Sequence, residues 1–219
     1  MLIGVVTGDI VSSYKMKDKS IWLNKLKEIL NASPKGLLDR ADQWDIFRGD
    51  SFQVRVTKPE KTLLLLLLIR AGLNAIPSFT ELDMDVRMAI GIGTEDYASD
   101  SISESDGAAY RYSGQLLDQM VKEKVKIALH SPWQELDDEM RVSLALADAL
   151  ISGWSYKSAE IAWLALSGMT NQKALAKHLK ISQPAVHKRL QRVYLEEITM
   201  LENRYQKQVR QYADEYGST

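Results

Sequence analysis

Two stretches of the sequence decide the fold: MLIGVVTGDIVSS at residues 1–13 and FRGDSFQVRV at residues 47–56. The first begins with a continuous apolar, β-prone run, which is typical of a strand that is covered on both faces. The second has aromatic and β-branched residues on both sides of a Gly-Asp pair, which predicts a hairpin with Asp50 at its tip. Each stretch therefore places one aspartate, Asp9 or Asp50, directly after a glycine where a strand ends or turns.

These two aspartates are the first candidates for a functional site. Two carboxylates delivered by neighbouring strands form a compact set of oxygen ligands, which suits Mg²⁺ or Mn²⁺, and such a metal usually serves a phosphate group. A lone Gly-Asp pair is also a very common turn, so the structural alternative for either aspartate is an ordinary loop. The metal hypothesis therefore depends on the two aspartates lying together.

The pattern around these stretches alternates strands and helices over residues 1–130. Apolar residues at helical spacing predict a helix over 20–30, and the six consecutive leucines within 62–75 favour a buried helix over a strand. Residues 84–93 indicate a strand whose glycines allow close approach by a neighbour or a ligand. A polar loop over 94–106, a helix over 107–122 and an edge strand over 126–130 follow. The order β-α-β-β-α-β is the split βαβ arrangement of ferredoxin-like domains, which makes the N-terminal part α+β.

Four segments in this region carry a family resemblance. The first 130 residues resemble the SatD family of bacterial proteins through TGDIVSS at 7–13, FRGDSFQ at 47–53, RMAIGIG at 87–93 and SDGAAYRYSG at 105–114. Behind that family we suspect the palm-like fold of class III nucleotidyl cyclases and diguanylate cyclases. The resemblance implies that Asp9 and Asp50 hold the metals, which neutralise phosphate charge and activate an attacking hydroxyl. It also implies a metal ligand in the carbonyl of Ile10 and triphosphate contacts from the amides of Val11, Ser12 and Ser13.

The sequence also departs from those cyclases. They carry a base-reading lysine four positions before the second metal aspartate, where this chain has Ile46. Arg111 and Gln115 stand near the places of their transition-state asparagine and arginine, and the diguanylate-cyclase signature is absent. We expect Arg48 and Arg111 to contact phosphate instead, because guanidinium groups bind phosphate oxygens with paired hydrogen bonds. The departures favour binding of a nucleoside triphosphate or another nucleotide over cyclisation, and no catalytic residue is assigned.

The composition sets limits on the protein class. With 219 residues, 45% of them hydrophobic and 26% charged, the chain is long enough for one large or two small globular domains. The absence of cysteine excludes disulfides, thiolate zinc sites and cysteine nucleophiles. The longest apolar run is too short to span a membrane, and the N-terminus lacks the pattern of a signal peptide. We therefore expect a cytoplasmic, soluble protein without a membrane partner.

From Ser131 onward the pattern is all helical. Early acidic residues and a terminating Gly153 predict a helix within 131–154, which we interpret as a connector between domains. A second helix is predicted over 155–166. Residues 170–198 then contain two helices separated by a turn at Lys180, the second one capped by Ser182 and followed by a proline in its first turn. This spacing resembles the DNA-binding helix-turn-helix of many bacterial regulators.

The charge of this segment agrees with DNA binding. Residues 171–192 contain six lysines and arginines and no acid, although the net charge of the whole chain is −1. The resemblance places one group of side chains in the major groove and a second group on phosphates. The first group is Ser182, Gln183, His187, Lys188 and Gln191; the second is Lys173, Lys180, Arg189 and Arg192. The alternative is a three-helix packing module whose cations are merely solvated.

The C-terminal tail over 194–216 continues as a helix with apolar residues close to heptad spacing: Leu195, Ile198, Leu201, Tyr205, Val209 and Tyr212. This seam either pairs with a second copy, as in a homodimer on a palindromic site, or packs back on its own chain. The sequence leaves both alternatives open.

The sequence therefore predicts three parts: a ferredoxin-like, cyclase-like metal and nucleotide domain over 1–130, a connector helix over 131–154, and an all-α helix-turn-helix domain over 155–219. The corresponding function is a DNA-binding regulatory protein with a metal-dependent nucleotide-binding domain. The alternative is a metal-dependent nucleotidyl cyclase or nucleotidyltransferase acting on a nucleoside triphosphate.

Overall fold

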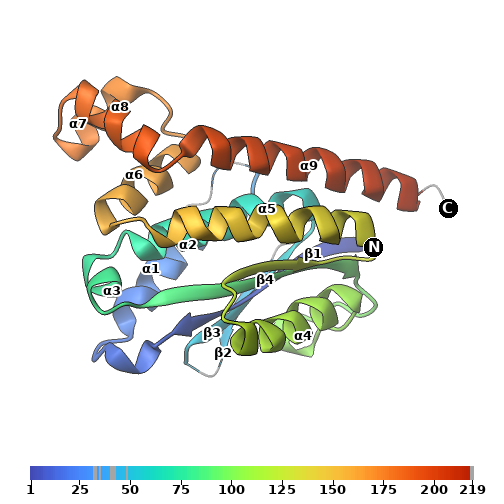
Figure 1. The fold of residues 1–219 in the computed structure, drawn as a ribbon. Helices are drawn as coiled ribbons and strands as arrows, with labels where there is room; N and C mark the ends of the chain where they lie inside the picture. The colour runs from blue at the N-terminus through green and yellow to red at the C-terminus, as the bar shows by residue number, and fades with distance from the viewer. Residues whose placement is uncertain (32–33, 35, 40–42, 48, 218–219) are drawn as a thin grey trace.

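The computed structural model describes residues 1–31, 34, 36–39, 43–47 and 49–217, and in these the chain forms a mixed α/β fold around a five-stranded sheet (Figure 1). The strand order is β2-β3-β1-β4-β5. The central strand β1 (Leu2–Val11) pairs antiparallel with β3 (Ser51–Val56) and with β4 (Asp85–Thr94). β2 (Gln43–Phe47) lies antiparallel to β3, and β5 (Ile127–His130) lies parallel to β4.

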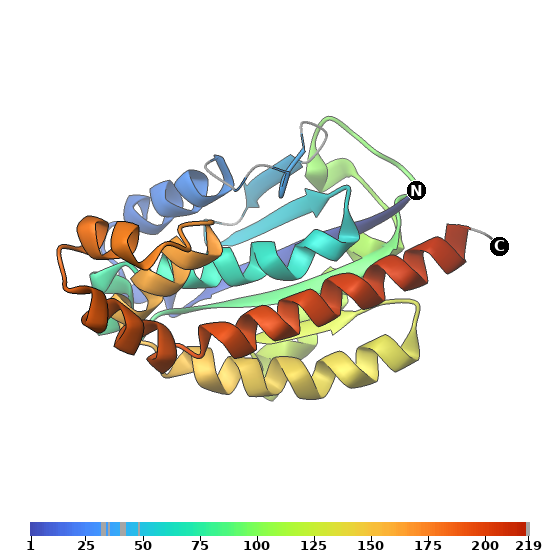
Figure 2. The same ribbon diagram turned by 90° about the horizontal axis from the view of Figure 1, so that it is seen from above.

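Helices cover the two faces of the sheet unequally. On one side of the sheet lie α2 (Thr62–Asn74), α5 (Gln134–Ser152), α6 (Tyr156–Leu166) and the long α9 (Leu195–Gly217), as Figures 1 and 2 show. All four contribute to a large apolar core. α1 (Ser20–Asn31) and the short α3 (Pro77–Glu81) add to this core. The opposite face carries α4 (Ala108–Glu123) and a small second cluster. The described residues also form three 3₁₀ turns: η1 (Ser13–Lys15), η2 (Pro59–Lys61) and η3 (Ile102–Glu104).

Two glycines of β4 explain how α4 packs. A Cβ atom on Gly91 would lie 2.2 Å from the carbonyl oxygen of Ala109, and one on Gly93 would lie 2.7 Å from the backbone nitrogen of Ala109. Only glycine leaves room for the helix backbone at these positions. The close approach expected from the sequence is therefore made by a neighbouring helix of the same chain.

The predicted helices and strands agree with the structure in order and, within a few residues, in extent. β1 is longer than the apolar run that predicts it, because it continues through Asp9 to Val11. The loop over 94–106 has more structure than expected, since it contains η3 and an antiparallel bridge between Tyr97 and Asp106.

The segment expected to connect two domains is part of the core. α5 buries one face, formed by Leu136, Met140, Leu144, Ala147 and Ile151, in the same apolar cluster as the sheet. Residues of α6 to α9 belong to that cluster as well. The apolar core therefore continues without a break across residues 131 and 155, where the sequence predicted domain boundaries.

The apolar seam of the tail packs in cis. Ile198, Tyr205 and Val209 are buried, and the hydroxyl of Tyr205 donates to the carbonyl oxygen of Pro59 at 3.0 Å and also contacts the Thr62 hydroxyl. Of the two alternatives for the seam, the structure shows the one in which α9 packs back on its own chain.

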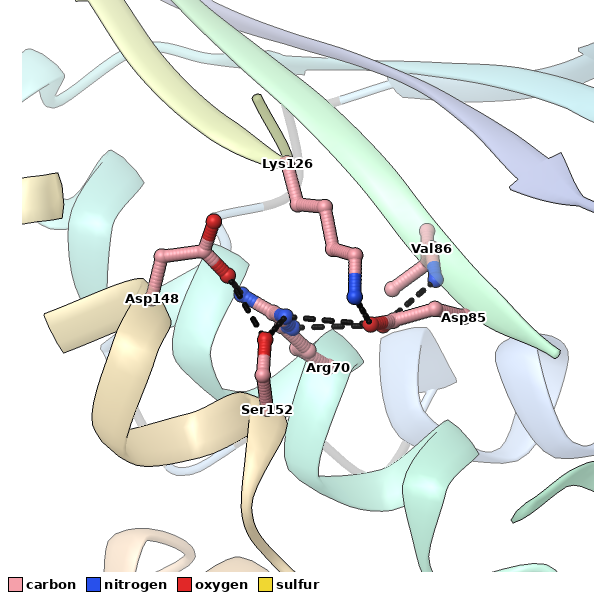
Figure 3. A network of polar contacts seen from close by, with 6 residues as sticks. All are labelled: Arg70, Asp85, Val86, Lys126, Asp148 and Ser152. Carbon is pink, nitrogen blue, oxygen red and sulfur yellow. Dashed lines mark hydrogen bonds and ion pairs between the residues drawn. The ribbon is translucent and has the colours of Figure 1, made fainter. Parts of the chain in front are cut away.

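A network of buried ion pairs connects α5 to the sheet and to α2 (Figure 3). Arg70 on α2 is fully buried and pairs with Asp85 of β4 at 3.1 Å and with Asp148 of α5 at 2.7 Å. Lys126 adds a second cation to Asp85 at 2.7 Å. Burial raises the pKa of Asp85, but Arg70 and Lys126 outweigh it and hold that pKa below its ordinary value. The network therefore keeps its buried charges paired across three elements.

α7 (Gln172–Leu179) and α8 (Gln183–Arg192) lie together at one end of the molecule, beside the start of α9 (Figure 1). No helix within the described ranges is both long and apolar enough to cross a membrane.

Candidate functional site

Asp9 lies near the end of the central strand, between two neighbours. In register it stands opposite Ser51 of β3 on one side and Arg87 of β4 on the other. The guanidinium of Arg87 donates to Asp9 Oδ2 at 3.1 Å and to Oδ1 at 3.4 Å. The carboxylate is half-buried on the sheet face that α4 covers farther along β1. Asp9 is therefore held in a defined position by a partner from the next strand.

Asp50 comes to the same end of the sheet from the hairpin between β2 and β3. Gly49 before it has φ +75°, a left-handed conformation that favours glycine and allows the tight turn. The backbone carbonyl of Asp50 accepts a hydrogen bond from the N–H of Ile10 at 2.9 Å. Its carboxylate accepts one from the Ser13 hydroxyl at 2.9 Å. The structure thus places Asp9, Asp50 and Ser13 at one end of the sheet.

Asp50 lies near enough to Asp9 to affect the pKa of its carboxyl. Burial raises the pKa of Asp9 above its ordinary value, the positive charge of Arg87 opposes this shift, and the negative charge of Asp50 adds to it. A divalent cation between the two carboxylates would remove the repulsion that raises this pKa.

The backbone after Asp9 turns away from the strand at once. Val11 is the last residue of β1 and stands opposite Asp85, and Ser12 has a left-handed φ of 61°. The η1 turn then begins at Ser13, and the carbonyl of Ser12 accepts from the N–H of Lys15 at 2.9 Å. The first N–H groups of a helical turn have no partner inside that turn. This is the segment whose amides are assigned to phosphate by the resemblance to the cyclases.

The structure describes only one of the two arginines that were expected to bind phosphate. Arg48 lies outside the described residues. Arg111 does not reach Asp9, because it is at the start of α4, paired with Asp106 at 2.9 Å and with Asp96 at 3.3 Å. Asp96 follows the end of β4, where Thr94 stands opposite Leu2. Leu2 is seven residues from Asp9, about 23 Å along an extended strand, so the structure removes Arg111 from this site.

Two cations near the carboxylates were not predicted. Arg87 pairs with Asp9, and its Nε is buried without a partner among the described residues. Lys19 reaches the hairpin tip, where its Nζ lies 4.0 Å from the position that a Cβ atom on Gly49 would occupy. The alternation Lys15, Lys17, Lys19 directly after TGDIVSS was a visible signal for the lysine. The register that sets Arg87 beside Asp9 had no such signal.

The donor set agrees with a magnesium or manganese ion that is shared with a phosphate. Two carboxylates and a serine hydroxyl supply oxygen ligands, and Mg²⁺ in proteins is commonly held by one or two carboxylates together with water and phosphate oxygens. Within the described ranges, no three His, Cys, Asp or Glu side chains are grouped closely enough to bind a metal by themselves. Asp9 and Asp50 would hold the ion, while Arg87 already neutralises part of their charge.

The second candidate region is formed by α7, the turn after it and α8. Asn171 caps α7 by accepting from the N–H groups of Lys173 and Ala174, and Ser182 caps α8 by accepting from Ala185 N–H at 3.4 Å. Between the helices Lys180 adopts a left-handed φ of 54°. Leu175 and Val186 are buried inside, so one side of each helix packs against the protein and the other faces solvent.

The polar side of these two helices carries cations without acidic partners. Lys173, Lys180, Lys188 and Arg192 are exposed and Arg189 is half-buried; none of them forms an ion pair within the described part of the chain. The other side chains predicted to read DNA, Ser182, Gln183, His187 and Gln191, are exposed too. The predicted DNA-contacting residues therefore form one accessible surface on α7 and α8.

Comparison with known proteins identifies the family. The SatD family matches residues 3–209, and the chain therefore belongs to the SatD family. The match extends beyond the first 130 residues that carry the resemblance in the sequence, and it includes α5 to α8 and most of α9.

Among solved structures, the chain is similar to one described as a bacterial light-regulated adenylyl cyclase. The identity is 14% and the TM-score is 0.38, and the match covers 59% of this chain and 42% of that one. No curated protein matches the sequence.

Proposed function

We propose that this SatD family protein is a DNA-binding regulatory protein whose sheet domain binds a metal–nucleotide complex. The observation that carries the DNA-binding part is the surface of cations on α7 and α8 that form no ion pair with any residue that the structure describes. Cations that have no partner in the folded chain remain available to replace the counterions of DNA phosphates. A chain without cysteine suits the reducing cytoplasm in which such a regulator acts.

The arrangement of α7 and α8 supports a helix-turn-helix. The helices are joined by a short turn around Lys180, and α6 packs on α8 as a third helix. In such a module the second helix enters the major groove with its N-terminal residues at the bases. The exposed Gln183 and His187 on α8 take that role, while Lys173 and Arg192 contact the backbone.

The arrangement of the sheet supports a ferredoxin-like core for the nucleotide-binding part. The order β2-β3-β1-β4 with α1 and α2 on one face follows the split βαβ pattern, to which β5 adds a parallel edge strand. Asp9 and Asp50 hold Mg²⁺ or Mn²⁺ in this proposal, and the Ser12–Ser13 turn, Arg87 and Lys19 lie close enough to take part in binding the phosphates.

DNA binding is tested by fluorescence anisotropy with a duplex of mixed sequence at low salt. The double variant Lys188→Ala, Arg189→Ala is expected to weaken binding at least tenfold, because it removes two cations that face phosphates or bases. Lys122→Ala, Lys124→Ala, which removes two exposed cations at the end of α4, is the matched control. Equal binding by both double variants and the wild type would show that the α7–α8 surface does not contact DNA.

Nucleotide binding is tested by calorimetry with Mn²⁺ and each nucleoside triphosphate. Asp50→Asn is expected to abolish binding of the complex. Asp39→Asn, which neutralises an exposed carboxylate paired with Lys58, is the control and should leave binding unchanged. If no nucleotide binds the wild-type protein, the nucleotide-binding half of the proposal fails, and the DNA-binding half is unaffected.

The convergence of Asp9 and Asp50 also favours a second candidate, a nucleotidyl cyclase or nucleotidyltransferase. Two metal-binding carboxylates are the chemistry that such an enzyme requires. Release of pyrophosphate from a nucleoside triphosphate by the wild-type protein with Mn²⁺, and its loss in Asp50→Ala, would establish the enzyme. No release at any metal concentration leaves nucleotide binding as the role of this site.

A further inference from the structure

α5 and α9 expose an apolar face beside the start of α9. Met200 is 70% exposed, Leu146 is 66% exposed and Val142 is 61% exposed, three of the most exposed large apolar side chains in the described residues. Leu146 and Met200 line one groove between the two antiparallel helices, which lie side by side in Figure 2. Contiguous exposed apolar surface of this kind marks an interaction site.

This face borders the apolar seam predicted for the tail, since the seam residues Ile198 and Leu201 form part of the groove wall. The seam residues Ile198, Tyr205 and Val209 point into the core of their own chain. The outward face of α9 presents Glu197, Met200 and Arg204 at steps of three and four residues, which places them in one row. All three line the groove, with the apolar residue between two opposite charges.

The charge order along this row fits a second copy of the same row. Glu197 and Arg204 are seven residues apart, about 10 Å along the helix, and Met200 lies near their midpoint. A twofold axis near Met200 that sets two α9 helices antiparallel places Glu197 of each chain opposite Arg204 of the other. A parallel pairing would instead set Glu197 against Glu197 and Arg204 against Arg204, and like charges in contact are unfavourable.

Arg204 can form the second contact while it keeps the first. It pairs with Glu139 of α5 within its own chain at 3.0 Å, yet its side chain remains 53% exposed. A guanidinium has five N–H donors, so it can bind two carboxylates at once. Glu139 also orients Arg204 at the edge of the groove, which lowers the entropic cost of an additional partner.

We infer that the face formed by Val142, Leu146, Glu197, Met200 and Arg204 binds a second copy of this chain in an antiparallel, twofold-symmetric dimer. Met200 and Leu146 are the apolar centre, and the two Glu197–Arg204 pairs fix the direction. In an isologous contact each residue is used twice, so a single chain supplies both sides. The dimer deepens the proposed function, and rests on it, by giving the protein two α8 helices, each beside the start of its own α9 and on opposite sides of the twofold axis.

The test measures mass by sedimentation equilibrium on the full chain without DNA. The wild type is expected to have twice the mass of one chain at micromolar concentration, and Leu146→Glu is expected to be a monomer. Val121→Glu is the matched control, because Val121 is 51% exposed on α4, on the other face of the sheet. Circular dichroism melting checks that each variant is folded.

Charge exchange tests the direction of pairing. Glu197→Arg alone and Arg204→Glu alone are each expected to weaken the dimer at least tenfold, and the double exchange Glu197→Arg, Arg204→Glu to restore it. A wild-type monomer at all concentrations overturns the dimer, and a double variant as weak as the single ones overturns the antiparallel pairing. Neither measurement includes DNA or nucleotide, so neither result affects the DNA-binding test with the Lys188→Ala, Arg189→Ala variant. Failure of the dimer is therefore distinguishable from failure of the proposed function.

Discussion

The carboxylate site and the basic α7–α8 surface differ in what their charged side chains contact. At the end of the sheet, Asp9 has Arg87, Asp50 has Ser13, and the nearby Asp85 has both Arg70 and Lys126. On α7 and α8, cations such as Lys188 and Arg192 have no acidic partner within the described residues. A charge satisfied inside the chain supports the fold or a prearranged site, whereas an unsatisfied one is available to an external partner.

The largest expected effect comes from the buried side of this comparison. Arg70→Met leaves Asp85 and Asp148 without their shared cation, and breaking a buried pair from one side typically costs about 3–5 kcal/mol. Urea denaturation should show a decrease of the unfolding free energy in that range. Arg141→Met, in which the arginine is 81% exposed, is the control, and its effect should stay within about 0.5 kcal/mol. Equal effects of the two substitutions would show that the network adds nothing to stability.

The next effect concerns binding and not stability. Lys173→Ala, Arg192→Ala removes two cations predicted to face DNA phosphates, which should weaken DNA binding uniformly across sequences. The slope of log affinity against log salt concentration should become less steep by about 1 for each cation removed. Gln183→Ala should reduce preference among sequences and leave that slope unchanged. A change in the urea midpoint of the Lys173→Ala, Arg192→Ala variant would instead show that these two cations contribute to the stability of the fold.

A smaller effect is expected where α9 is attached to the sheet domain. Tyr205→Phe removes the hydrogen bond from the buried hydroxyl to Pro59, at a cost of about 1 kcal/mol of unfolding free energy. Burial raises the pKa of Tyr205, so the hydroxyl is retained as a neutral donor at all ordinary pH values. Tyr212→Phe, whose hydroxyl bonds to exposed Glu135, is the control and should change stability by less than about 0.5 kcal/mol.

The smallest expected effect is a change in the pKa of the Asp9 carboxyl. The pKa of Asp9 is raised in the folded chain, so ionising Asp9 costs stability as the pH rises from its unfolded pKa, about 3.9, through the folded value. Asp50→Asn removes a neighbouring negative charge, and should lower the pKa of Asp9 and reduce that cost. Arg87→Met should raise the pKa further. Carbon-13 NMR of the Asp9 carboxyl measures the pKa in both variants. An unchanged pKa of Asp9 in Asp50→Asn would show that the two carboxylates do not interact.

The two regions also differ in how well the sequence predicts them. Local patterns suffice for the helices of the C-terminal part, because the caps Asn171 and Ser182 and the spacing of Leu175 and Val186 lie within a few residues of one another. They suffice for the Asp9 and Asp50 turns as well. Arg87 was missed because its place beside Asp9 depends on strand register, which short patterns do not determine.

Long-range packing explains the remaining differences. Arg111 was expected to contact phosphate, but the start of α4 lies beside the end of β4, at the end of the strands away from Asp9. The helix over 131–154 was interpreted as a connector because the pattern becomes all helical from Ser131 onward, and only the fold shows that its apolar face completes the core. From its sequence, the apolar seam of the tail fits a partner chain and its own chain equally well. The contact of Tyr205 with Pro59 in the structure shows that the seam packs on its own chain.

The attachment at Tyr205 couples α9 to the part of the chain that follows the β2–β3 hairpin. The helix has 23 residues, and Tyr205 is ten residues from its start, about 15 Å along the axis. The start of α9 adjoins α8, and η2 follows soon after β3, so the contact between Tyr205 and Pro59 links the hairpin strand, through α9, to the helix that carries the cations. The chain thus has one continuous series of contacts from the strand that begins beside Asp50 to the surface proposed to bind DNA.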